Sequence, residues 1–220
     1  MSPVLQVDAA APTSADLAEA VDHLRAGGVL AYPTETVYGL GGAIDPGPVA
    51  RVLEIKGRQP DRPLLVLLPS RESADGLRWT PAARRLADAF WPGALTLVLA
   101  DPQGIFPKGV RSPWTGGVGV RVSPNPVACG LVEAFGRPLT STSLNVAGGA
   151  PARSGAEAVT VARALAGDEI LVIDVGPLPP SAASTLVDCT ADVPVVLRAG
   201  SLPVEELRRV TPEIHERARD

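Results

Sequence analysis

Side chains that can bind anions gather in four short segments of this 220-residue chain. The first segment, PTETVYGLGG at residues 33–42, directly follows an apolar run and combines hydroxyls, one carboxylate and three glycines. Thr34, Thr36 and Tyr38 offer hydrogen-bonding hydroxyls, and the glycines allow a backbone to approach a ligand closely. The segment matches neither the GxGxxG nor the GxxxxGK[ST] phosphate-binding pattern, so a tight hydrogen-bonded turn is an equally good interpretation.

The second segment, KGRQPDRP at residues 56–63, concentrates positive charge after a predicted helix. Lys56 and Arg58 stand at the end of that helix, and Arg62 follows Pro60. An arginine fork matches phosphate oxygens, and a lysine acts as a mobile point charge. Cations near a helix C-terminus also interact favourably with its dipole, by about 0.3 to 1 kcal/mol, so a purely structural role stays open.

The third segment, TSTSLNVAGG at residues 140–149, places Ser141, Ser143 and Asn145 between an apolar strand and two glycines. Its hydroxyl and amide donors suit a phosphate or a carboxylate. Side-chain capping of a turn explains the same residues without any ligand. Taken alone, the segment therefore favours a structural role slightly.

The fourth segment pairs SAAST with LRAG and contributes Ser184 and Arg198, while Arg121 in GVGVRV offers another guanidinium. All four segments stand beside the ends of predicted strands, where open α/β sheets form ligand crevices. No paired carboxylates and no nucleophile with an adjacent base stand out. The pattern therefore indicates a site that works by positioning and by stabilising negative charge, as in phosphoryl or adenylyl transfer.

Several classes of function are disfavoured by what the chain contains. The only histidines, His23 and His215, lie outside every polar segment, which argues against Ser-His-Asp catalysis and histidine metal sites. Cys129 and Cys189 are isolated and read as buried structural thiols. A net charge of −4 gives no polycationic surface for nucleic acid. Without an apolar run of about 20 residues or a secretory signal, a cytoplasmic protein is expected.

The elements that must position these side chains alternate between helices and short apolar strands, which predicts an α/β fold. Adjacent strands at residues 94–100 and 117–122 indicate a mixed sheet. We expect one domain over residues 1–220, with its core at about 14–203 and a C-terminal tail at about 204–220. The helices are predicted at residues 13–26, 46–56, 80–91, 125–136 and 157–166, and the other strands at 29–32, 62–70, 137–145, 169–176, 184–190 and 193–200.

Taken in this order, the segments resemble the YrdC-type threonylcarbamoyl-AMP synthase family. The matching elements, which span residues 31–200, are PTETVYGLG, the KxR of KGR with the following RPL, WPGALTLVL, VGVRV, the SxN of SLN with GG after it, STLVD and LRAG. Each motif is weak alone, but the ordered set is specific. The resemblance implies a three-layer YrdC-like fold with a twisted mixed β-sheet flanked by helices and an open cleft.

The resemblance also implies an activity, that of a nucleotidyltransferase. An L-threonylcarbamoyladenylate synthase forms threonylcarbamoyl-AMP and pyrophosphate from L-threonine, bicarbonate and ATP, with Mg²⁺ accompanying the ATP. The product then reaches a separate transferase that modifies adenosine in tRNA. The match further leads us to expect the short, single-domain form of the family, without a membrane partner and with at most weak direct RNA binding.

Family positions carry over onto single residues of this sequence. Lys56 and Arg58 correspond to the catalytic cations, which with Mg²⁺ are expected to neutralise the leaving pyrophosphate. Arg121 is the expected partner of the amino-acid carboxylate. The resemblance implies ATP binding by Lys56, Arg58, Arg62, Ser143, Asn145 and Arg198, and threonine binding by Thr34, Arg121, Ser141 and Ser184.

Several positions depart from the family pattern. The family commonly has asparagine at Arg62, histidine at Leu67, threonine at Gly117 and a further histidine near Asn125, and the stretch after SxN here reads APARS. Two alternatives therefore stay open: a paralogous carbamoyl-adenylate-forming enzyme with another acceptor, and a non-catalytic RNA-binding YrdC-like module. An aromatic content of 4% and the negative net charge argue against the RNA-binding module.

Overall fold

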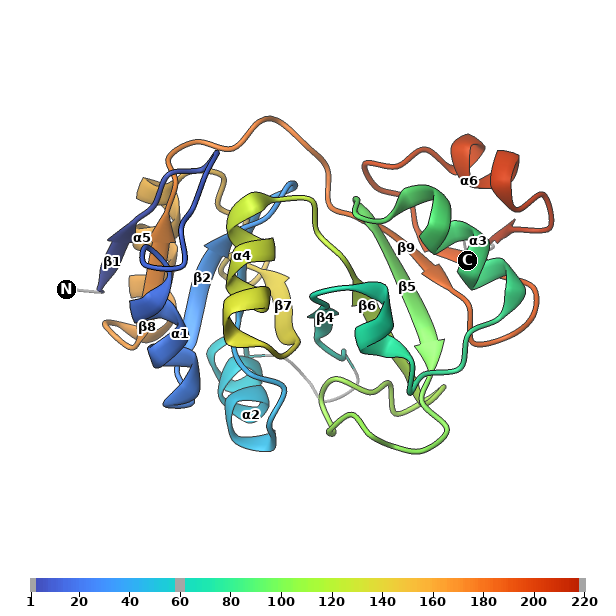
Figure 1. Cartoon of the computed structure of the whole chain (residues 1–220), viewed down its shortest axis with the longest axis horizontal. Coiled ribbons are helices and arrows are strands. Elements are labelled where there is room, and N and C mark those ends of the chain that lie inside the picture. Colours follow the sequence, from blue (N-terminus) through green and yellow to red (C-terminus); the bar gives the residue numbers. More distant parts are fainter. Residues whose placement is uncertain (1–2, 58–61, 218–220) are drawn as a thin grey trace.

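A computed structural model describes residues 3–57 and 62–217 of the chain. In this described part the strands form one mixed sheet of 11 strands, in the order β1-β8-β2-β3-β7-β4-β6-β5-β9-β10-β11 (Figure 1). The strands are β1 (Val4–Gln6), β2 (Val29–Pro33), β3 (Tyr38–Gly41), β4 (Leu65–Leu67), β5 (Leu95–Ala100), β6 (Gly117–Arg121), β7 (Leu139–Ser143), β8 (Ile170–Asp174), β9 (Thr185–Asp188), β10 (Val195–Arg198) and β11 (His215–Glu216).

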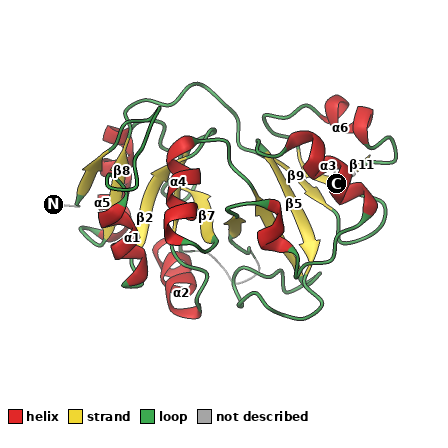
Figure 2. Cartoon of the chain, in the orientation of Figure 1, coloured by secondary structure: helices red, strands yellow, loops and turns green. Residues whose placement is uncertain are grey.

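Helices pack on this sheet, so the fold belongs to the α/β class that the sequence predicts (Figure 2). Strands β5 and β6 pair antiparallel, as expected, whereas β2 pairs with β8 in parallel. The predicted mixed sheet is therefore confirmed. The helices are α1 (Ala18–Arg25), α2 (Pro46–Ile55), α3 (Pro81–Phe90), α4 (Pro126–Phe135), α5 (Gly155–Ala166) and α6 (Val204–Val210), with a short 3₁₀ helix at Arg71–Ala74.

Two hydrophobic clusters lie against the sheet because successive side chains of a strand point to opposite faces. In β2, Leu30 and Tyr32 pack with α1 and α4, whereas Val29 and Ala31 belong to the cluster that contains residues of α2 and α5. The second cluster continues along the sheet to α3 and α6. Helices thus cover both faces around β2, which gives the expected three layers.

Local signals in the sequence explain where several helices begin. Thr80 Oγ1 accepts a hydrogen bond from the Ala83 amide at the start of α3, and Asn125 Oδ1 accepts from two amides at the start of α4. Asp45 occupies the N-cap position of α2, but its side chain forms no cap hydrogen bond. Its carboxylate instead accepts from Arg137 at 2.7 Å.

The strand β3 has no counterpart in the sequence prediction. Residues 33–42 complete β2, turn, and return as β3, which pairs antiparallel with both β2 and β7. A Cβ on Gly41 would lie 1.7 Å from the Thr140 carbonyl oxygen, so the backbone of β7 leaves no room for a side chain there. The segment interpreted from the sequence as a turn therefore includes a strand, and Gly41 permits its close packing against β7.

The C-terminal residues 204–216 are also more ordered than expected. They form α6 and β11, and Val204, Leu207 and Ile214 are buried in the same cluster as the sheet residues. The expected boundary of the core at residue 203 is therefore too early, because a short helix with few apolar positions gives a weak periodic signal. No helix in the described residues is long and apolar enough to cross a membrane.

Replacing Leu207 tests whether α6 is part of the core. Leu207 is fully buried, so we expect Leu207→Ala to lower the free energy of unfolding by about 2 to 5 kcal/mol, the usual cost of such a cavity. Urea denaturation followed by circular dichroism measures the change. Arg209→Ala on the exposed face of α6 is the control, with an expected change below about 0.5 kcal/mol. Equal midpoints for Leu207→Ala and the unmodified protein would contradict this assignment.

Candidate functional site

A cleft of about 720 Å³ lies over the middle of the sheet. Seven of the residues expected to bind ATP or threonine line it, namely Thr34, Arg62, Arg121, Ser141, Ser143, Ser184 and Arg198. Lys56 and Asn145 both form hydrogen bonds with Ser143 and therefore lie next to the lining. Arg58 lies outside the described residues. The segments that are separated in the sequence are therefore brought to one place.

Strand register explains why Ser141 and Arg121 lie on the same face of the sheet, at the floor of the cleft. Ser141 in β7 lies opposite Leu65 in β4, and Leu67, two residues further along β4, lies opposite Arg121 in β6. Paired residues and residues two apart share a face of a sheet. Ser141, Leu65 and Arg121 therefore present their side chains on the same face, and all three line the cleft.

Arg121 is held by a carboxylate from the PTETVYGLGG segment. Its Nη1 donates to Glu35 Oε1 at 2.6 Å, and the Ser123 hydroxyl donates to Glu35 Oε2 at 2.5 Å. The side chains of Arg121 and Glu35 are only 7% and 17% exposed. Sequence reasoning assigned no role to Glu35, although it is the one carboxylate of a segment otherwise selected for its hydroxyls.

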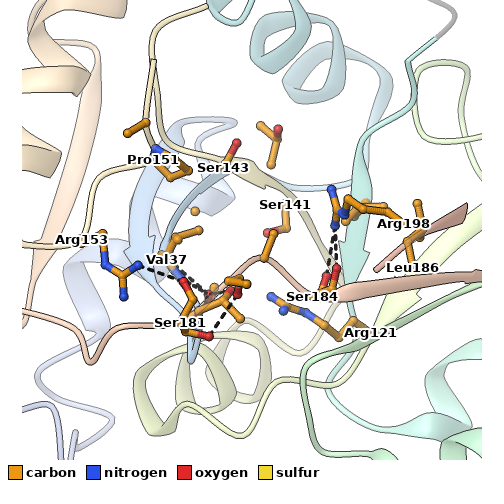
Figure 3. Close-up of a pocket in the computed structure, with 18 of the residues that line it drawn as sticks. Val37, Arg121, Ser141, Ser143, Pro151, Arg153, Ser181, Ser184, Leu186 and Arg198 are labelled. Carbon is orange, nitrogen blue, oxygen red and sulfur yellow. Dashed lines mark hydrogen bonds between the residues drawn. The ribbon is translucent and has the colours of Figure 1, made fainter. Parts of the chain in front are cut away.

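Arg198 and Ser184 form the neighbouring part of the wall (Figure 3). Arg198 Nη2 donates to the Ser184 carbonyl oxygen at 2.9 Å, and the Ser184 hydroxyl lies 2.9 Å from Thr96 Oγ1. Burial, together with the positive charge of Arg121, lowers the pKa of Arg198 below its ordinary value. The environment therefore disfavours the charged guanidinium, and an anion in the cleft would oppose that effect.

Lys56 joins the end of α2 to the loop after β7. Its Nζ donates to the carbonyl oxygens of Ser143 and Asn145, at 3.0 and 2.6 Å, and to Asn145 Oδ1 at 2.9 Å. The Ser143 hydroxyl donates to the same Oδ1 at 2.6 Å. The lysine of the KxR motif and the SxN motif thus form one hydrogen-bonded unit, and their role toward ATP stays a prediction.

Thr34 confirms the hydrogen-bonded turn in its segment, and its role toward a ligand stays a prediction. Its hydroxyl donates to the Val37 carbonyl oxygen at 2.7 Å and accepts from the Thr36 amide at 3.2 Å, which closes a tight turn. The same residue lines the cleft. A turn stabilised by its own side chains therefore forms one wall of the site.

Arg153 lines the cleft as well, and sequence reasoning missed it. Its guanidinium donates to the carbonyl oxygens of Ser181 and Pro179, at 2.9 and 2.5 Å. Figure 3 shows Arg153 on the opposite side of the cavity from Arg121 and Arg198. The only signal in the sequence was its position in APARS, where the segment departs from the family pattern.

Three positions that depart from the family pattern lie outside the cleft lining, whereas Arg62, which also departs from it, lies in the lining. Leu67 is buried in the cluster with α1 and α4. Gly117 begins β6, and a Cβ there would lie 2.7 Å from Val98 Cγ1. Asn125 caps α4. None of these three described residues belongs to the lining, so their side chains do not themselves shape the cavity wall.

The cysteines and the acidic residues offer little for metal binding. The described residues contain no group of three or more His, Cys, Asp or Glu side chains that could hold a metal ion. Burial raises the pKa of Cys189 to about 12. Burial also raises the pKa of Cys129, although this side chain is only half-buried and its thiol donates to the Ser123 carbonyl oxygen. Cys189 is thus the buried structural thiol that was expected.

The sheet and the cleft together define an α/β protein whose cleft is lined by arginines and hydroxyl side chains. The family model for Sua5, YciO and YrdC proteins, which carries the description "Telomere recombination", matches residues 22–200. The chain therefore belongs to the Sua5/YciO/YrdC family. The family resemblance and the three-layer α/β fold expected from the sequence are confirmed.

Individual relatives support this assignment. The chain is 39% identical over 201 residues to the threonylcarbamoyl-AMP synthase of Pyrococcus abyssi, an alignment that covers 89% of this chain and 57% of the relative. P. abyssi Sua5 in complex with L-threonine superposes with a TM-score of 0.89 at 34% identity, over 98% of this chain and 63% of that one. E. coli YciO superposes with a TM-score of 0.83 at 29% identity, over 94% of this chain and 100% of the YciO chain. The chain thus spans somewhat over half the length of its P. abyssi relative.

Arg153 provides a test of how the cleft wall is held. Because it donates to two carbonyls of the segment 177–183, we expect Arg153→Ala to accelerate amide hydrogen exchange there by at least roughly tenfold. Hydrogen–deuterium exchange with mass spectrometry measures the effect. Arg163→Ala, an exposed arginine of α5, should leave the segment unchanged. Exchange in Arg153→Ala that matches the unmodified protein would show that the segment does not depend on this guanidinium.

Proposed function

We propose that the chain is an L-threonylcarbamoyladenylate synthase, a nucleotidyltransferase that makes threonylcarbamoyl-AMP and pyrophosphate from L-threonine, bicarbonate and ATP. One observation carries this proposal. A single cleft combines Arg121, Ser141 and Ser184 with Ser143 and Arg198, so groups suited to an amino acid and groups suited to a nucleotide adjoin. Family membership and the P. abyssi relative's name support the same reaction.

The amino-acid end of the cleft would be formed around Arg121. One guanidinium nitrogen donates to Glu35, and a guanidinium has five N–H donors, so donors remain for a substrate carboxylate. Thr34, Ser141 and Ser184 supply hydroxyls for the polar groups of threonine. The threonine complex of P. abyssi Sua5 supports this use of the cleft.

The nucleotide end would be formed by Arg62, Ser143 and Arg198, together with Arg58 from the segment that the structure leaves undescribed. Lys56 already donates to three acceptors of the SxN unit. Its expected contribution is therefore twofold: it holds Ser143 and Asn145 in place, and its charge adds to the positive potential at the phosphates.

The reaction then needs positioning and charge stabilisation. The threonine amine attacks bicarbonate, or CO₂ derived from it, and loses a proton as the carbamate forms, with release of water in the case of bicarbonate. A carbamate oxygen attacks the α-phosphorus of ATP, and the bond to pyrophosphate breaks. Holding both substrates in one cleft makes the second step effectively intramolecular. Lys56, Arg58 and Arg198 would stabilise the negative charge on the departing pyrophosphate.

Magnesium would enter with ATP. The described cleft residues bring no carboxylate cluster, and both oxygens of Glu35 already accept hydrogen bonds from Arg121 and Ser123. Phosphate oxygens and water are the ligands that Mg²⁺ commonly keeps in nucleotide sites, so this donor set fits a nucleotide-borne ion. When bound, the ion would neutralise phosphate charge. We further propose that the chain acts in the cytoplasm and that its product passes to a separate tRNA threonylcarbamoyl transferase.

Pyrophosphate release tests the proposed function. Incubation with ATP, Mg²⁺ and bicarbonate should release pyrophosphate in the presence of threonine, and mass spectrometry should detect threonylcarbamoyl-AMP. Serine, other amino acids and no amino acid are the controls. Release that depends on a different acceptor would favour the paralogous enzyme, and an absence of ATP binding would favour the RNA-binding module.

Lys56 and Arg58 test the assigned roles of the KxR motif. We expect Lys56→Ala and Arg58→Ala each to lower kcat by roughly 100-fold, because a positioned charge at the reacting phosphates is lost. Lys108→Ala is the matched control, since Lys108 is the only other lysine and is exposed on a loop. Normal turnover of both variants at saturating ATP would refute the assignment.

A further inference from the structure

Glu35 is the one charged residue of the PTETVYGLGG segment, and the proposed function gives it no task. It lies in the turn between β2 and β3, where its carboxylate accepts from Arg121 through one oxygen and from Ser123 through the other. The Ser123 hydroxyl oxygen in turn accepts from the Asn125 amide at 3.2 Å. A chain of hydrogen bonds thus runs from the start of α4 through Ser123 and Glu35 to Arg121.

This chain of hydrogen bonds limits how the Arg121 side chain can move. A guanidinium is planar, so a hydrogen bond at one nitrogen constrains the direction of the others. Figure 3 shows the Arg121 side chain extending into the cavity beside Ser184. With Nη1 held by Glu35, the remaining donors keep one orientation toward the cleft. Ser123 is 4% exposed, so the carboxylate itself is also held within packed structure.

Charge gives a second reason for Glu35 to be here. Burial and, to a smaller extent, the nearby positive charge of Arg121 lower the pKa of Arg198, so the two guanidinium groups repel each other. Burying a guanidinium without a counter-ion destabilises the protein. Glu35 provides a counter-ion for Arg121 and thereby offsets this destabilisation. The charges of Arg121 and Glu35 therefore nearly cancel, and this end of the cleft suits a zwitterionic amino acid better than a polyphosphate.

We propose that Glu35 is the positioning residue for Arg121 and thereby determines recognition of the amino-acid carboxylate in the cleft. This inference rests on the proposed function. Glu35 acts through Arg121 and does not itself contact the reacting atoms. Its loss should weaken threonine binding and leave ATP binding almost unchanged, because the side-chain hydrogen bonds of Ser143, Asn145 and Arg198 within the described residues do not involve Glu35.

Isothermal titration calorimetry of threonine and ATP binding to a set of variants tests the proposal. Glu35→Ala should weaken threonine binding roughly 10- to 100-fold, which corresponds to one charge-assisted hydrogen bond, with less than about a threefold change for ATP. Glu35→Gln keeps an oxygen for Arg121, so it should retain the fold and lose less affinity than Glu35→Ala. Glu213→Gln, at a surface ion pair with Arg85, is the control and should bind threonine normally.

Two further comparisons separate positioning from a general structural role. Threonine amide lacks the carboxylate, so its binding should change little in Glu35→Ala. In an Arg121→Met background, Glu35→Ala should weaken threonine binding by less than about twofold, because its effect passes through Arg121. An additive effect, or an equal loss of threonine and threonine amide, would overturn the proposal.

A ligand-free measurement keeps this inference distinct from the proposed function. If the unmodified protein binds ATP but not threonine, the proposed acceptor is wrong. The crystal structure of ligand-free Glu35→Ala still decides the positioning role. A displaced or multiply oriented Arg121 side chain supports it, and an Arg121 that keeps its direction into the cleft overturns it.

Discussion

The alternation of side chains along β7 is the constraint on which the cleft depends. Ser141 and Ser143 point to the cleft, whereas Thr140 points to the other face, where its hydroxyl hydrogen-bonds with the backbone of Gly42. Antiparallel pairing with β3 and β4 fixes this register on both sides. A slip by one residue would exchange the two faces and remove both serines from the site. The pairing of the sheet therefore determines that Ser141 and Ser143, and not Thr140, face the cleft.

The second feature of the site is how its cations are held. Arg153 and Arg198 both donate to backbone carbonyl oxygens, which orient a cation without cancelling its charge. Among the described cations that line the cleft, Arg121 alone forms an ion pair with a carboxylate, that of Glu35. This difference leaves the Arg121 guanidinium closer to charge neutrality than the guanidinium groups of Arg153 and Arg198. The proposed function places a zwitterion at Arg121 and a polyphosphate beside Arg198.

Much of this arrangement could be predicted from the sequence, because most elements carry strong local signals. The predicted helix ranges 80–91 and 125–136 agree closely with α3 and α4, and the short apolar strands located most of the sheet. Strand β3 was missed because its segment was interpreted as a tight turn, and α6 because it is short. Glu35 and Arg153 were missed for another reason: their roles come from contacts with residues 86 and 26 or more positions away, which no local pattern reveals.

The central claim is that one cleft holds an amino acid at Arg121 next to nucleotide phosphates at Ser143 and Arg198. A crystal structure with L-threonine and a non-hydrolysable ATP analogue tests it most directly. The account predicts the threonine carboxylate on the Arg121 guanidinium, with its amine directed toward the phosphates. Threonine bound elsewhere, or phosphates on Arg121, would contradict it.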